Sequence, residues 1–412
     1  MILEVESLRI NICGLCSSKN LKSIFNFGLQ PLANSLNLES SPKVERTFEL
    51  NLLICTECFL VQLSEKVNPN LMFSEYSWIT GTSDSTKRHC EKLAKQILNY
   101  KPLKRKKILE IGSNDATFLY NFINSQAELI LGVDPANNFT TFYKPPLEFF
   151  NTFFTEASAK EILAKYGHFD VIVARNVFSH IPDAREVFRA VSILLAKNGI
   201  FYIEFHWLKV ILNELHYDSI YHEHTYYHSI NSISRFLSEF GLQPFEVWES
   251  PISGGSLILS VSKENQDSSN NLHIYNDLEK ESGICDLESW NKFSFKIEQN
   301  ISEAREYLER NNDKKIYGFG VSARSSTIMN AIGTSSNYLK GIADNNKLKW
   351  GKYTPGVHLP IMSPKKAVGY KPDIFMIFPF NFELEIIDQL KQLGWSGEVV
   401  LPLPKKLRTF TI

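Results

Sequence analysis

The fold is decided by the stretch KKILEIGSNDATFLYNFINSQ, residues 106–126. Its first part, KKILEIGS, is a short apolar run that ends near a glycine, which is typical of a buried strand entering a tight turn. The residues DATFLYNFINSQ then predict a helix that covers the sheet. The turn reads G-S-N-D-A-T and not G-x-G-x-x-G, so a pyrophosphate would find no glycine cradle here.

Strands and helices alternate after this stretch, which predicts a parallel sheet with helices on its faces. The expected elements are strands over 128–136, 147–154, 169–181 and 199–208 and a helix over 184–198. Two more strands, 242–250 and 256–264, lie on either side of Gly254-Gly255 and predict an antiparallel ending. The fold class is therefore α/β, with a Rossmann-like sheet.

A second strand–turn–helix unit opens at KKIYGFGVSARSSTIMNAIG, residues 314–333. Its turn, G-F-G-V-S-A (318–323), meets the G-x-G-x-x-A pattern, and Asp344 follows at the tip of the next expected strand. By itself this unit predicts a dinucleotide site and an NAD-dependent oxidoreductase. Residues 268–312 are expected to be polar, exposed helices that join the two αβ bodies.

Six cysteines include two C-x-x-C pairs, Cys13 with Cys16 and Cys55 with Cys58. Two thiolates three residues apart can hold one face of a tetrahedral zinc ion, and the second pair completes a Cys₄ site. Unrelated structural thiols and a redox C-x-x-C are the alternatives, and the presence of two copies argues against both. Since four protein ligands leave no open coordination position, we expect a structural zinc.

The chain has 412 residues, of which 43% are apolar and 22% charged, and its net charge is −1. This length predicts two or three domains, which we place at 1–75 (zinc-binding), 76–265 (first αβ body) and 266–412 (second αβ body). Without a basic excess or an apolar stretch of about eighteen residues, binding to nucleic acid or to a membrane is not expected. The acidic N-terminus does not fit a signal peptide, so we expect a cytoplasmic protein, as a monomer or weak dimer.

Polar side chains gather where the strands of the first body end, which is where a doubly wound sheet binds its ligand. Glu110 and Gly112 lie at the end of the first strand, and Asp134, about twenty residues on, is placed to hold a ribose. Asn176 follows the fourth strand and would face the methionine end of S-adenosylmethionine. The order fits a dinucleotide as well, but the missing glycine cradle favours S-adenosylmethionine; ordinary strand-end turns are the alternative. Further candidates for the same ligand are Asn114 and Ser83.

The densest polar cluster is Tyr221-His222-Glu223-His224, within DSIYHEHTYYHS (218–229). A histidine next to a carboxylate is a standard general base near neutral pH. The two histidines are separated by one residue, so the segment does not match the zinc-protease pattern H-E-x-x-H. An exposed polar loop without catalytic function is the alternative. Further candidates for the same pocket are His180 and Tyr76.

Besides the cysteine pairs, a series of short segments runs along the chain. These are G-L-Q-P-L-A-N (28–34), C-F-L-V-Q-L (58–63), F-S-E-Y-S-W (73–78), E-I-G-S-N-D (110–115), N-V-F-S-H (176–180), Y-H-E-H (221–224), S-G-G-S-L (253–257), Y-T-P-G-V-H-L-P-I (353–361) and N-F-E-L-E-I (381–386). In this order and spacing they resemble the nucleotide-sugar C-methyltransferases of deoxysugar biosynthesis, which place a methyl branch on C3 of a TDP-4-keto-6-deoxyhexose. The resemblance implies a class I S-adenosylmethionine methyltransferase sheet followed by a second Rossmann-like domain.

The resemblance also implies an active site made by Tyr221, Glu223 and His224. We expect His224 to remove the C3 proton that a 4-keto group acidifies, Glu223 to orient its ring, and Tyr221, aided by His180, to stabilise the oxyanion. His222 is the alternative base, since adjacent side chains in an extended segment point to opposite faces. The second body would hold the nucleotide sugar rather than NAD, with a helix N-terminus and an arginine at the diphosphate. The remaining residues assigned to the pocket or the substrate are Tyr76, His222, Arg324 and Asn381.

The sequence departs from the family pattern at two places. S-G-G-S-L-I replaces H-G-G-S-x-R, so Ser253 and Ile258 stand for a histidine and an arginine. G-F-G-V-S-A-R-S replaces G-Y-G-A-x-A-K-G, with Arg324 for a lysine. These changes leave the sugar and the acceptor atom open, so an O-methyltransferase on a related sugar is one alternative. An NAD-dependent nucleotide-sugar oxidoreductase and a non-catalytic, zinc-anchored binding protein are the others.

Overall fold

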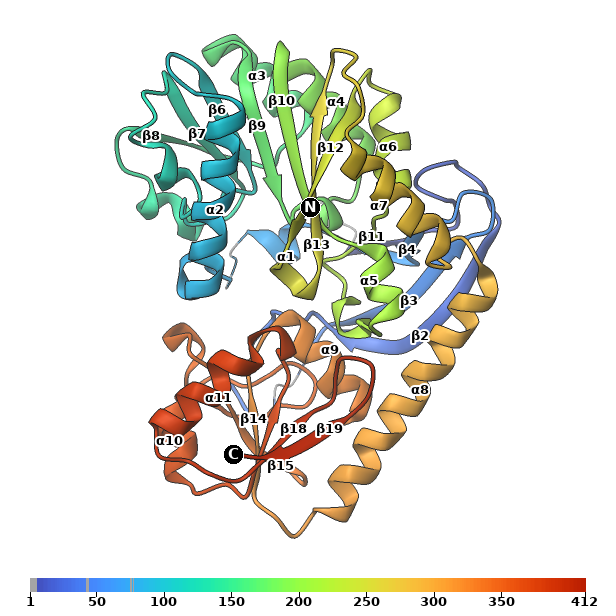
Figure 1. Ribbon diagram of the computed structural model, residues 1–412. Coiled ribbons are helices and arrows are strands. Elements are labelled where there is room, and N and C mark those ends of the chain that lie inside the picture. The colour runs from blue at the N-terminus through green and yellow to red at the C-terminus, as the bar shows by residue number, and fades with distance from the viewer. Residues whose placement is uncertain (1–5, 42–43, 75, 77) are drawn as a thin grey trace.

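The computed structural model describes residues 6–41, 44–74, 76 and 78–412. Figure 1 shows two αβ bodies, one formed by residues 84–262 and the other by residues 316–411, with a curved N-terminal sheet beside them. The long helix α8 (Leu287–Arg310) runs along the side of the molecule toward the second body. Within the described part of the chain, no helix has the length and apolar character needed to cross a membrane.

The first body contains a sheet in the order β12-β13-β10-β9-β6-β7-β8. The strands from β8 to β10 are parallel, whereas β13 is antiparallel to both β10 and β12, which confirms the expected antiparallel ending. The strand bounds are β6 (Lys107–Ile111), β7 (Leu129–Asp134), β8 (Leu147–Asn151), β9 (Phe169–Arg175), β10 (Leu195–His206), β12 (Gln243–Ser250) and β13 (Ser256–Ser262). The chain reverses its direction of travel across the sheet between β6 and β9, and ligands bind at such a switch point.

Helices cover both faces of this sheet because each carries one apolar face. The bounds are α2 (Asp84–Tyr100), α3 (Glu156–Tyr166), α4 (Ala184–Leu194), α5 (Leu208–Asn213), α6 (Ile230–Ser238) and α7 (Asn270–Glu281). On α2, Leu93 and Ile97 pack against Ile108 and Val171 on one side of the sheet. The buried faces of α3, α4 and α6 pack on the other side. The short 3-10 turns are η1 (Thr80–Thr82), η2 (Leu119–Phe122), η3 (Asn137–Phe142), η4 (Phe178–His180), η5 (Tyr217–Ser219) and η6 (Ile252–Gly254).

The helix predicted directly after the first strand, over 115–126, does not form. Asn114 and Ala116 have φ angles of 51° and 61°, which a right-handed helix excludes, and only the 3-10 turn η2 follows. The apolar side chains of this segment are nevertheless buried, Phe118 and Phe122 among them. The prediction of an inward-facing apolar segment is therefore right, and the prediction of a helix is wrong.

The N-terminal sheet takes one strand from the middle of the chain. Its order is β11-β4-β3-β2, and β11 (Tyr226–Tyr227) directly follows the Tyr221–His224 cluster. The other bounds are β2 (Leu21–Pro31), β3 (Thr47–Cys55) and β4 (Val61–Leu63), together with the separate pair β1 (Ser7–Arg9) and β5 (Glu65–Val67) and the short helix α1 (Asn70–Phe73). This sheet therefore builds part of the candidate active site.

The second body contains a sheet in the order β16-β15-β14-β17-β18-β19, parallel except for β19. Its bounds are β14 (Ile316–Phe319), β15 (Leu339–Ala343), β16 (Ile361–Met362), β17 (Ile374–Ile377), β18 (Glu398–Leu401), β19 (Arg408–Thr411), α9 (Ala323–Ile332), α10 (Pro364–Gly369), α11 (Glu383–Gln392), η7 (Lys347–Lys349) and η8 (Phe380–Phe382). The prediction of polar, exposed helices before it is wrong for α8. Its residues Trp290, Phe293 and Ile297 are buried in a core shared with Ile316 and Ile374.

Candidate functional site

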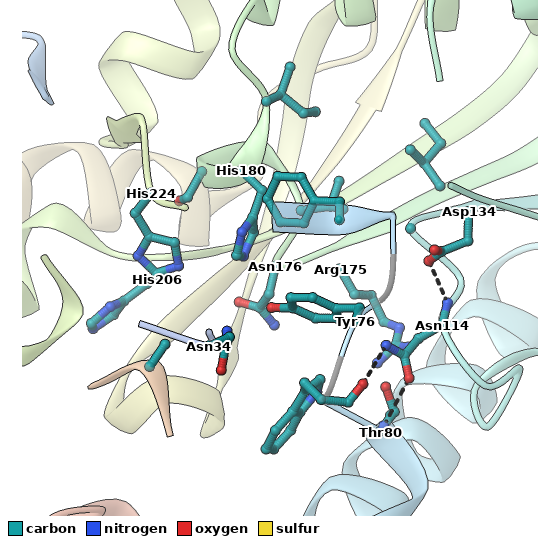
Figure 2. A pocket seen from close by; sticks show the side chains of 18 of the residues that line it. Asn34, Tyr76, Thr80, Asn114, Asp134, Arg175, Asn176, His180, His206 and His224 are labelled. Atoms are coloured by element: carbon teal, nitrogen blue, oxygen red, sulfur yellow. Dashed lines mark hydrogen bonds between the residues drawn. The ribbon is translucent and has the colours of Figure 1, made fainter. Parts of the chain in front are cut away.

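One cavity of about 800 Å³ is lined by residues from the N-terminal part of the chain and from both αβ bodies. Asn34 comes from the N-terminal sheet, Asp134 and Asn176 from the strand ends of the first body, and Arg324 and Asn381 from the second body. Figure 2 shows His180, His224 and Tyr76 turned toward this space between Asn34 and Asp134. This volume lies within the range of small-molecule sites, about 300 to 1,000 Å³.

The four cysteines form a compact cluster at one end of the N-terminal sheet. Their sulfur atoms all lie within 4.8 Å of one another, with Cys13 Sγ 3.4 Å from Cys58 Sγ and Cys16 Sγ 3.5 Å from Cys55 Sγ. A tetrahedral zinc with Zn–S bonds of about 2.3 Å needs sulfur atoms about 3.8 Å apart, so the cluster fits the ion. The backbone N–H groups of Leu15 and Cys16 point at Cys13 Sγ, as in a metal-binding knuckle. The cluster lies apart from the large cavity, as expected for a structural metal.

The donor end of the cavity is formed by the strand ends of β6 and β7. Gly112 has a φ of 65°, and a Cβ there would lie 2.3 Å from Val177 Cγ2, so only glycine fits. The Asp134 carboxylate lines the cavity and accepts the backbone N–H groups of Asn114 and Ala136, both at 2.9 Å. Burial raises its pKa, although these two amides oppose the rise. Held in this way, its remaining lone pairs can accept ribose hydroxyls.

Asn114 ties the segment before α2 to this end of the cavity. Its Oδ1 accepts from Thr80 N at 3.0 Å and its Nδ2 donates to Trp78 O at 3.1 Å, as Figure 2 shows. Both of its side-chain atoms are therefore engaged with the protein. Asn114 therefore fixes the segment that contains Trp78 and Thr80 against the strand ends, and it also lines the cavity itself.

Two of the predicted donor-binding residues do not reach the cavity. Glu110 is fully buried, and its Oε1 accepts from Arg175 Nε at 2.8 Å; Arg175, and not Glu110, lines the cavity. Ser83 is the N-cap of α2, where its hydroxyl accepts from Thr86 N. The cavity is lined instead by Thr86 and its neighbour Ser85. Both predictions are therefore corrected, because capping and ion pairing turn these side chains away from the ligand space.

Asn176 lines the cavity with one side of its amide group held by the protein. Its Nδ2 donates to Glu204 Oε2 at 3.1 Å, and its backbone N donates to Glu204 O at 2.8 Å. Glu204 is itself fixed by His89, whose Nε2 lies 2.7 Å from Glu204 Oε1. Burial alone would raise the pKa of Glu204, but the hydrogen bond and charge of His89 and the nearby Arg175 lower it overall. The amide oxygen of Asn176 is then the atom that can accept a hydrogen bond from a ligand.

His224 stands in the cavity with a defined tautomer. Its Nδ1 lies 2.8 Å from Ser219 O, and a carbonyl oxygen only accepts, so Nδ1 carries the proton. Its Nε2 lies 2.7 Å from the Tyr221 hydroxyl and therefore accepts. Burial and the neighbouring His180 lower the pKa of His224, so the ring is neutral at pH 7. The expectation that Glu223 orients this ring is wrong, because Ser219 O does so.

Glu223 is engaged on the other side of the loop. Asn34 Nδ2 donates to its Oε1 at 2.6 Å, and the Tyr76 hydroxyl donates to its Oε2 at 3.0 Å. His180 Nδ1 is 3.9 Å from Oε2, and the His180 ring lies 4.8 Å from the His224 ring, edge to face. Burial raises the pKa of Glu223 to about 7, while the bonds from Asn34 and Tyr76 limit the rise. Burial lowers the pKa of His180 to about 4, so its ring is neutral.

His222 does not belong to the substrate pocket. Its side chain is 2% exposed and its Nε2 lies 3.2 Å from Phe48 O in the N-terminal sheet. The segment is a turn and not an extended strand, since His224 N donates to Tyr221 O at 2.9 Å. This turn directs His222 into the protein and His224 into the cavity. Both the assignment of His222 to the substrate and its role as the alternative base are corrected.

The second body contributes Arg324 and Asn381 to the far end of the cavity. Arg324 forms a bidentate pair with Asp218, at 2.7 and 2.8 Å, and donates to Ser253 O at 2.8 Å. Its guanidinium group is thus held across the boundary between the two bodies. The N-terminus of α9, at Ser322 and Ala323, and Lys349 line the same end.

Several residues of the site carried no signal that sequence reasoning used. Asn34 lies in the G-L-Q-P-L-A-N segment, but nothing in the segment indicates a contact with residue 223. Arg175, the residue before Asn176, could have been found because a charged residue at the end of an apolar strand requires a partner. Other cavity residues missed from the sequence include His206, Ser219 and Lys349.

Comparisons with known proteins find similarity along most of the chain. Three family models match successive parts of the chain: "Putative zinc binding domain" over 13–73, "Methyltransferase domain" over 85–247 and "C-methyltransferase C-terminal domain" over 251–404. The C-methyltransferase NovU of Streptomyces niveus is 29% identical over 404 residues, which is 96% of each chain.

Solved structures resemble only part of the chain. The magnesium protoporphyrin IX methyltransferase of Synechocystis, with bound S-adenosylmethionine, is 13% identical and covers 44% of this chain and 80% of its own, with a TM-score of 0.34. A TehB-like S-adenosylmethionine-dependent methyltransferase of Corynebacterium glutamicum is 16% identical and covers 42% and 88%, with a TM-score of 0.33.

Proposed function

Because the chain belongs to the S-adenosylmethionine-dependent methyltransferases, with the zinc-binding and C-terminal domains of a C-methyltransferase, we propose that its acceptor is C3 of a nucleotide-linked 4-keto-6-deoxy sugar. The observation that carries this proposal is the single cavity in which the donor residues face a neutral histidine, two tyrosines and a cationic end. Methyl transfer to this carbon needs a base that removes the C3 proton, an acid that donates to the 4-oxygen, and residues that bind the rest of the substrate. The loop that carries Tyr221 and His224 would supply the first two, and the second body would supply the third.

The donor site uses residues of the first body. Asp134 would accept the ribose hydroxyls of S-adenosylmethionine, Asn176 would receive its methionine end, and the Gly112 turn allows close approach of the backbone. When bound there, S-adenosylmethionine supplies an electrophilic methyl group on a sulfonium. No glycine cradle is needed, since this donor carries no phosphate.

The base in this proposal is His224. Its Nε2 carries the free lone pair because Nδ1–H is fixed on Ser219 O, and it can take the proton from C3 of the sugar. The Tyr221 hydroxyl, which lies against Nε2 in the absence of substrate, would turn to the 4-oxygen and donate to the charge that develops there. The electron pair left on C3 would then form the new C–C bond with the methyl carbon, while the bond from that carbon to sulfur breaks and its electron pair leaves on sulfur with S-adenosylhomocysteine.

The imidazolium formed on His224 needs a nearby negative charge. Glu223 would supply it when ionised, through His180, whose Nδ1 lies 3.9 Å from Glu223 Oε2 and whose ring lies 4.8 Å from the His224 ring. Tyr76 lines the cavity and is held by Glu223, so its hydroxyl oxygen can also accept from the sugar. With the pKa of Glu223 raised to about 7, turnover should rise as pH increases through about 7, because the carboxyl ionises there.

The second body would hold the nucleotide. The N–H groups at the start of α9 and the ammonium group of Lys349 lie at the end of the cavity away from Asp134, where a diphosphate fits their positive charge. Arg324 is already paired with Asp218, so we assign it to joining the two bodies and presenting its remaining N–H groups to the substrate.

The experiment uses a TDP-4-keto-6-deoxyhexose with labelled methyl donor, and the product is read by mass spectrometry and NMR. A new methyl carbon bonded to C3 supports the proposal, and a methyl ether contradicts it. In deuterated water with S-adenosylhomocysteine in place of the donor, the wild-type protein should exchange the C3 proton. His224→Asn should bind both ligands but lose exchange; exchange at the wild-type rate would remove His224 as the base.

A further inference from the structure

Asn34 is the residue through which the zinc-bound sheet reaches into the active site. It lies in the loop that leads from β2 to β3, directly after two residues that anchor the loop: Leu32 packs with Phe48 and Met72, and Ala33 is buried. The Asn34 side chain lines the cavity (Figure 2) and donates from Nδ2 to Glu223 Oε1 at 2.6 Å. This contact joins residues that are 189 positions apart in the chain.

Few groups stabilise the ionised form of Glu223. The ion pairs formed by the described residues give it no lysine or arginine; its nearest basic group is His180 Nδ1 at 3.9 Å. Besides His180, the titratable groups that face it are the Tyr76 hydroxyl, which donates to Oε2, and Tyr221, whose own ionisation it opposes. A buried carboxylate without a cation relies on hydrogen bonds to stay ionised. Asn34 supplies the shorter of its two side-chain bonds.

Both ends of this contact are fixed by one sheet. Asn34 follows β2, and Glu223 precedes β11, which pairs with β4 in the same sheet. Leu63 N also donates to Thr225 O at 3.0 Å, next to the catalytic histidine. The other end of the sheet carries the cysteine cluster, since β3 ends at Cys55. The distance between Asn34 and Glu223 is therefore set by the sheet that the zinc ion closes.

We propose that Asn34 is a positioning residue for methyl transfer, which holds Glu223 ionised and turned toward Tyr76, so that the zinc-bound sheet sets the pH range in which the first body works. The effect on turnover rests on the proposed function, in which ionised Glu223 stabilises the imidazolium on His224. The effect on the ionisation of Glu223 does not rest on the proposed function.

The test compares Asn34→Leu and Asn34→Asp with the wild-type protein. Asn34→Leu removes the donor with little change in volume. A hydrogen bond to a charged group contributes about 1.5–3 kcal/mol, so its loss should raise the midpoint for ionisation of Glu223 by about one to two pH units. Asn34→Asp places a second carboxylate beside Glu223, and the two should share one proton, which raises the midpoint further.

Two readouts are needed. The first is the pH profile of turnover, in which Asn34→Leu should be slow at pH 7 and approach the wild-type rate at pH 9. A loss of the same factor at every pH would mean that Asn34 is merely structural, and an unchanged profile would mean that it does not act on Glu223. The second is infrared difference titration of the protonated carboxyl group, assigned with Glu223→Gln. It requires no substrate, so a shifted midpoint supports the proposal even where no sugar is methylated, and an unshifted midpoint overturns it.

Asn26→Leu is the matched control. Asn26 lies on the same strand β2 and also donates to a glutamate, with its Nδ2 3.1 Å from Glu49 Oε1, but both side chains are at the surface. This variant should keep the wild-type pH profile, zinc content and affinity for S-adenosylmethionine. If it shifts the profile as far as Asn34→Leu does, the shift comes from the sheet as a whole and the role assigned to Asn34 is wrong.

Discussion

The two αβ bodies share a plan, yet they treat the end of their first strand differently. In each, the strand leads to a glycine with a positive φ, 65° at Gly112 and 91° at Gly320. In each, an acidic residue at the next strand end accepts a backbone N–H group of that turn, at 2.9 Å for Asp134 and 2.7 Å for Asp344. Only in the first body do the glycine and the acidic residue themselves line the cavity; the second turn contributes Ser322 and Ala323, at the start of α9, instead.

The surroundings of the second turn explain the difference. A Cβ on Gly320 would lie 2.4 Å from Pro379 Cδ, so the glycine there makes room for a proline ring and not for a phosphate. Lys349 Nζ lies 3.7 Å from Asp344 Oδ2 and also donates to Val321 O, which engages the carboxylate that a ribose would need. A strand, a glycine turn and an acidic residue therefore specify a sheet but not a ligand site. Whether a ligand binds there depends on side chains that arrive from elsewhere.

The largest expected effect tests the sheet that lies beside the two bodies. A Cys55→Ser, Cys58→Ser variant should lose its zinc and most of its soluble yield, because small metal modules fold on their metal. Metal analysis of the purified wild-type protein should give about one zinc per chain. Cys285→Ser, at an exposed position, should change neither value. Full zinc in the double variant would contradict a four-cysteine site.

The next test asks whether the chemistry belongs to the first body alone. His224→Asn should lower methyl transfer by about 10²–10⁴-fold, the usual range for a general base, while both ligands still bind. His358→Asn in the second body removes a half-exposed histidine paired with Glu45 and should leave turnover unchanged. Equal losses in the two variants, measured by steady-state kinetics, would mean that the division between the bodies is wrong.

Matched substitutions of Asp134 and Asp344 test the difference between the two turns directly. Asp134→Asn should weaken binding of S-adenosylmethionine by about tenfold, since one charge-assisted hydrogen bond to the ribose contributes more than 1.4 kcal/mol. Asp344→Asn should leave that affinity unchanged, and calorimetric titration of either variant or of the wild type with NAD should give no binding heat. If NAD binds to the wild-type protein and Asp344→Asn weakens that binding, then the second turn does bind a dinucleotide.

The smallest effect concerns stability. The pKa of Glu223 is raised from the usual 4.5 to about 7, so between these values the folded state holds a proton that the unfolded state has lost. The free energy of unfolding then falls as pH rises through this window. Glu223→Gln should therefore raise the melting temperature at pH 8 by a few degrees and hardly change it at pH 4, measured by calorimetry, while turnover falls. A gain that is equal at both values would contradict a buried, titrating carboxyl.

Local sequence predicts the strands of the first αβ body well because each is an apolar run that ends at a turn. It predicts less where partners come from another domain. The helix expected after Asn114 is lost to positive φ angles that hold the cavity wall, and α8 has an apolar face that a polar average conceals. The loop residue His224 can be predicted, but the carbonyl of Ser219 that fixes its tautomer cannot, because that choice depends on the folded loop.

The strand exchange in the N-terminal sheet has a consequence for how the chain is made. The cysteine pairs and β2 to β4 leave the ribosome early, but the sheet has no β11 until residues 226 and 227 have been synthesised. Until then β4 presents an unpaired edge, and exposed edges promote association between chains. The N-terminal part is thus not a domain that finishes folding before the rest. Its last strand is delivered by the same loop that brings His224 into the cavity.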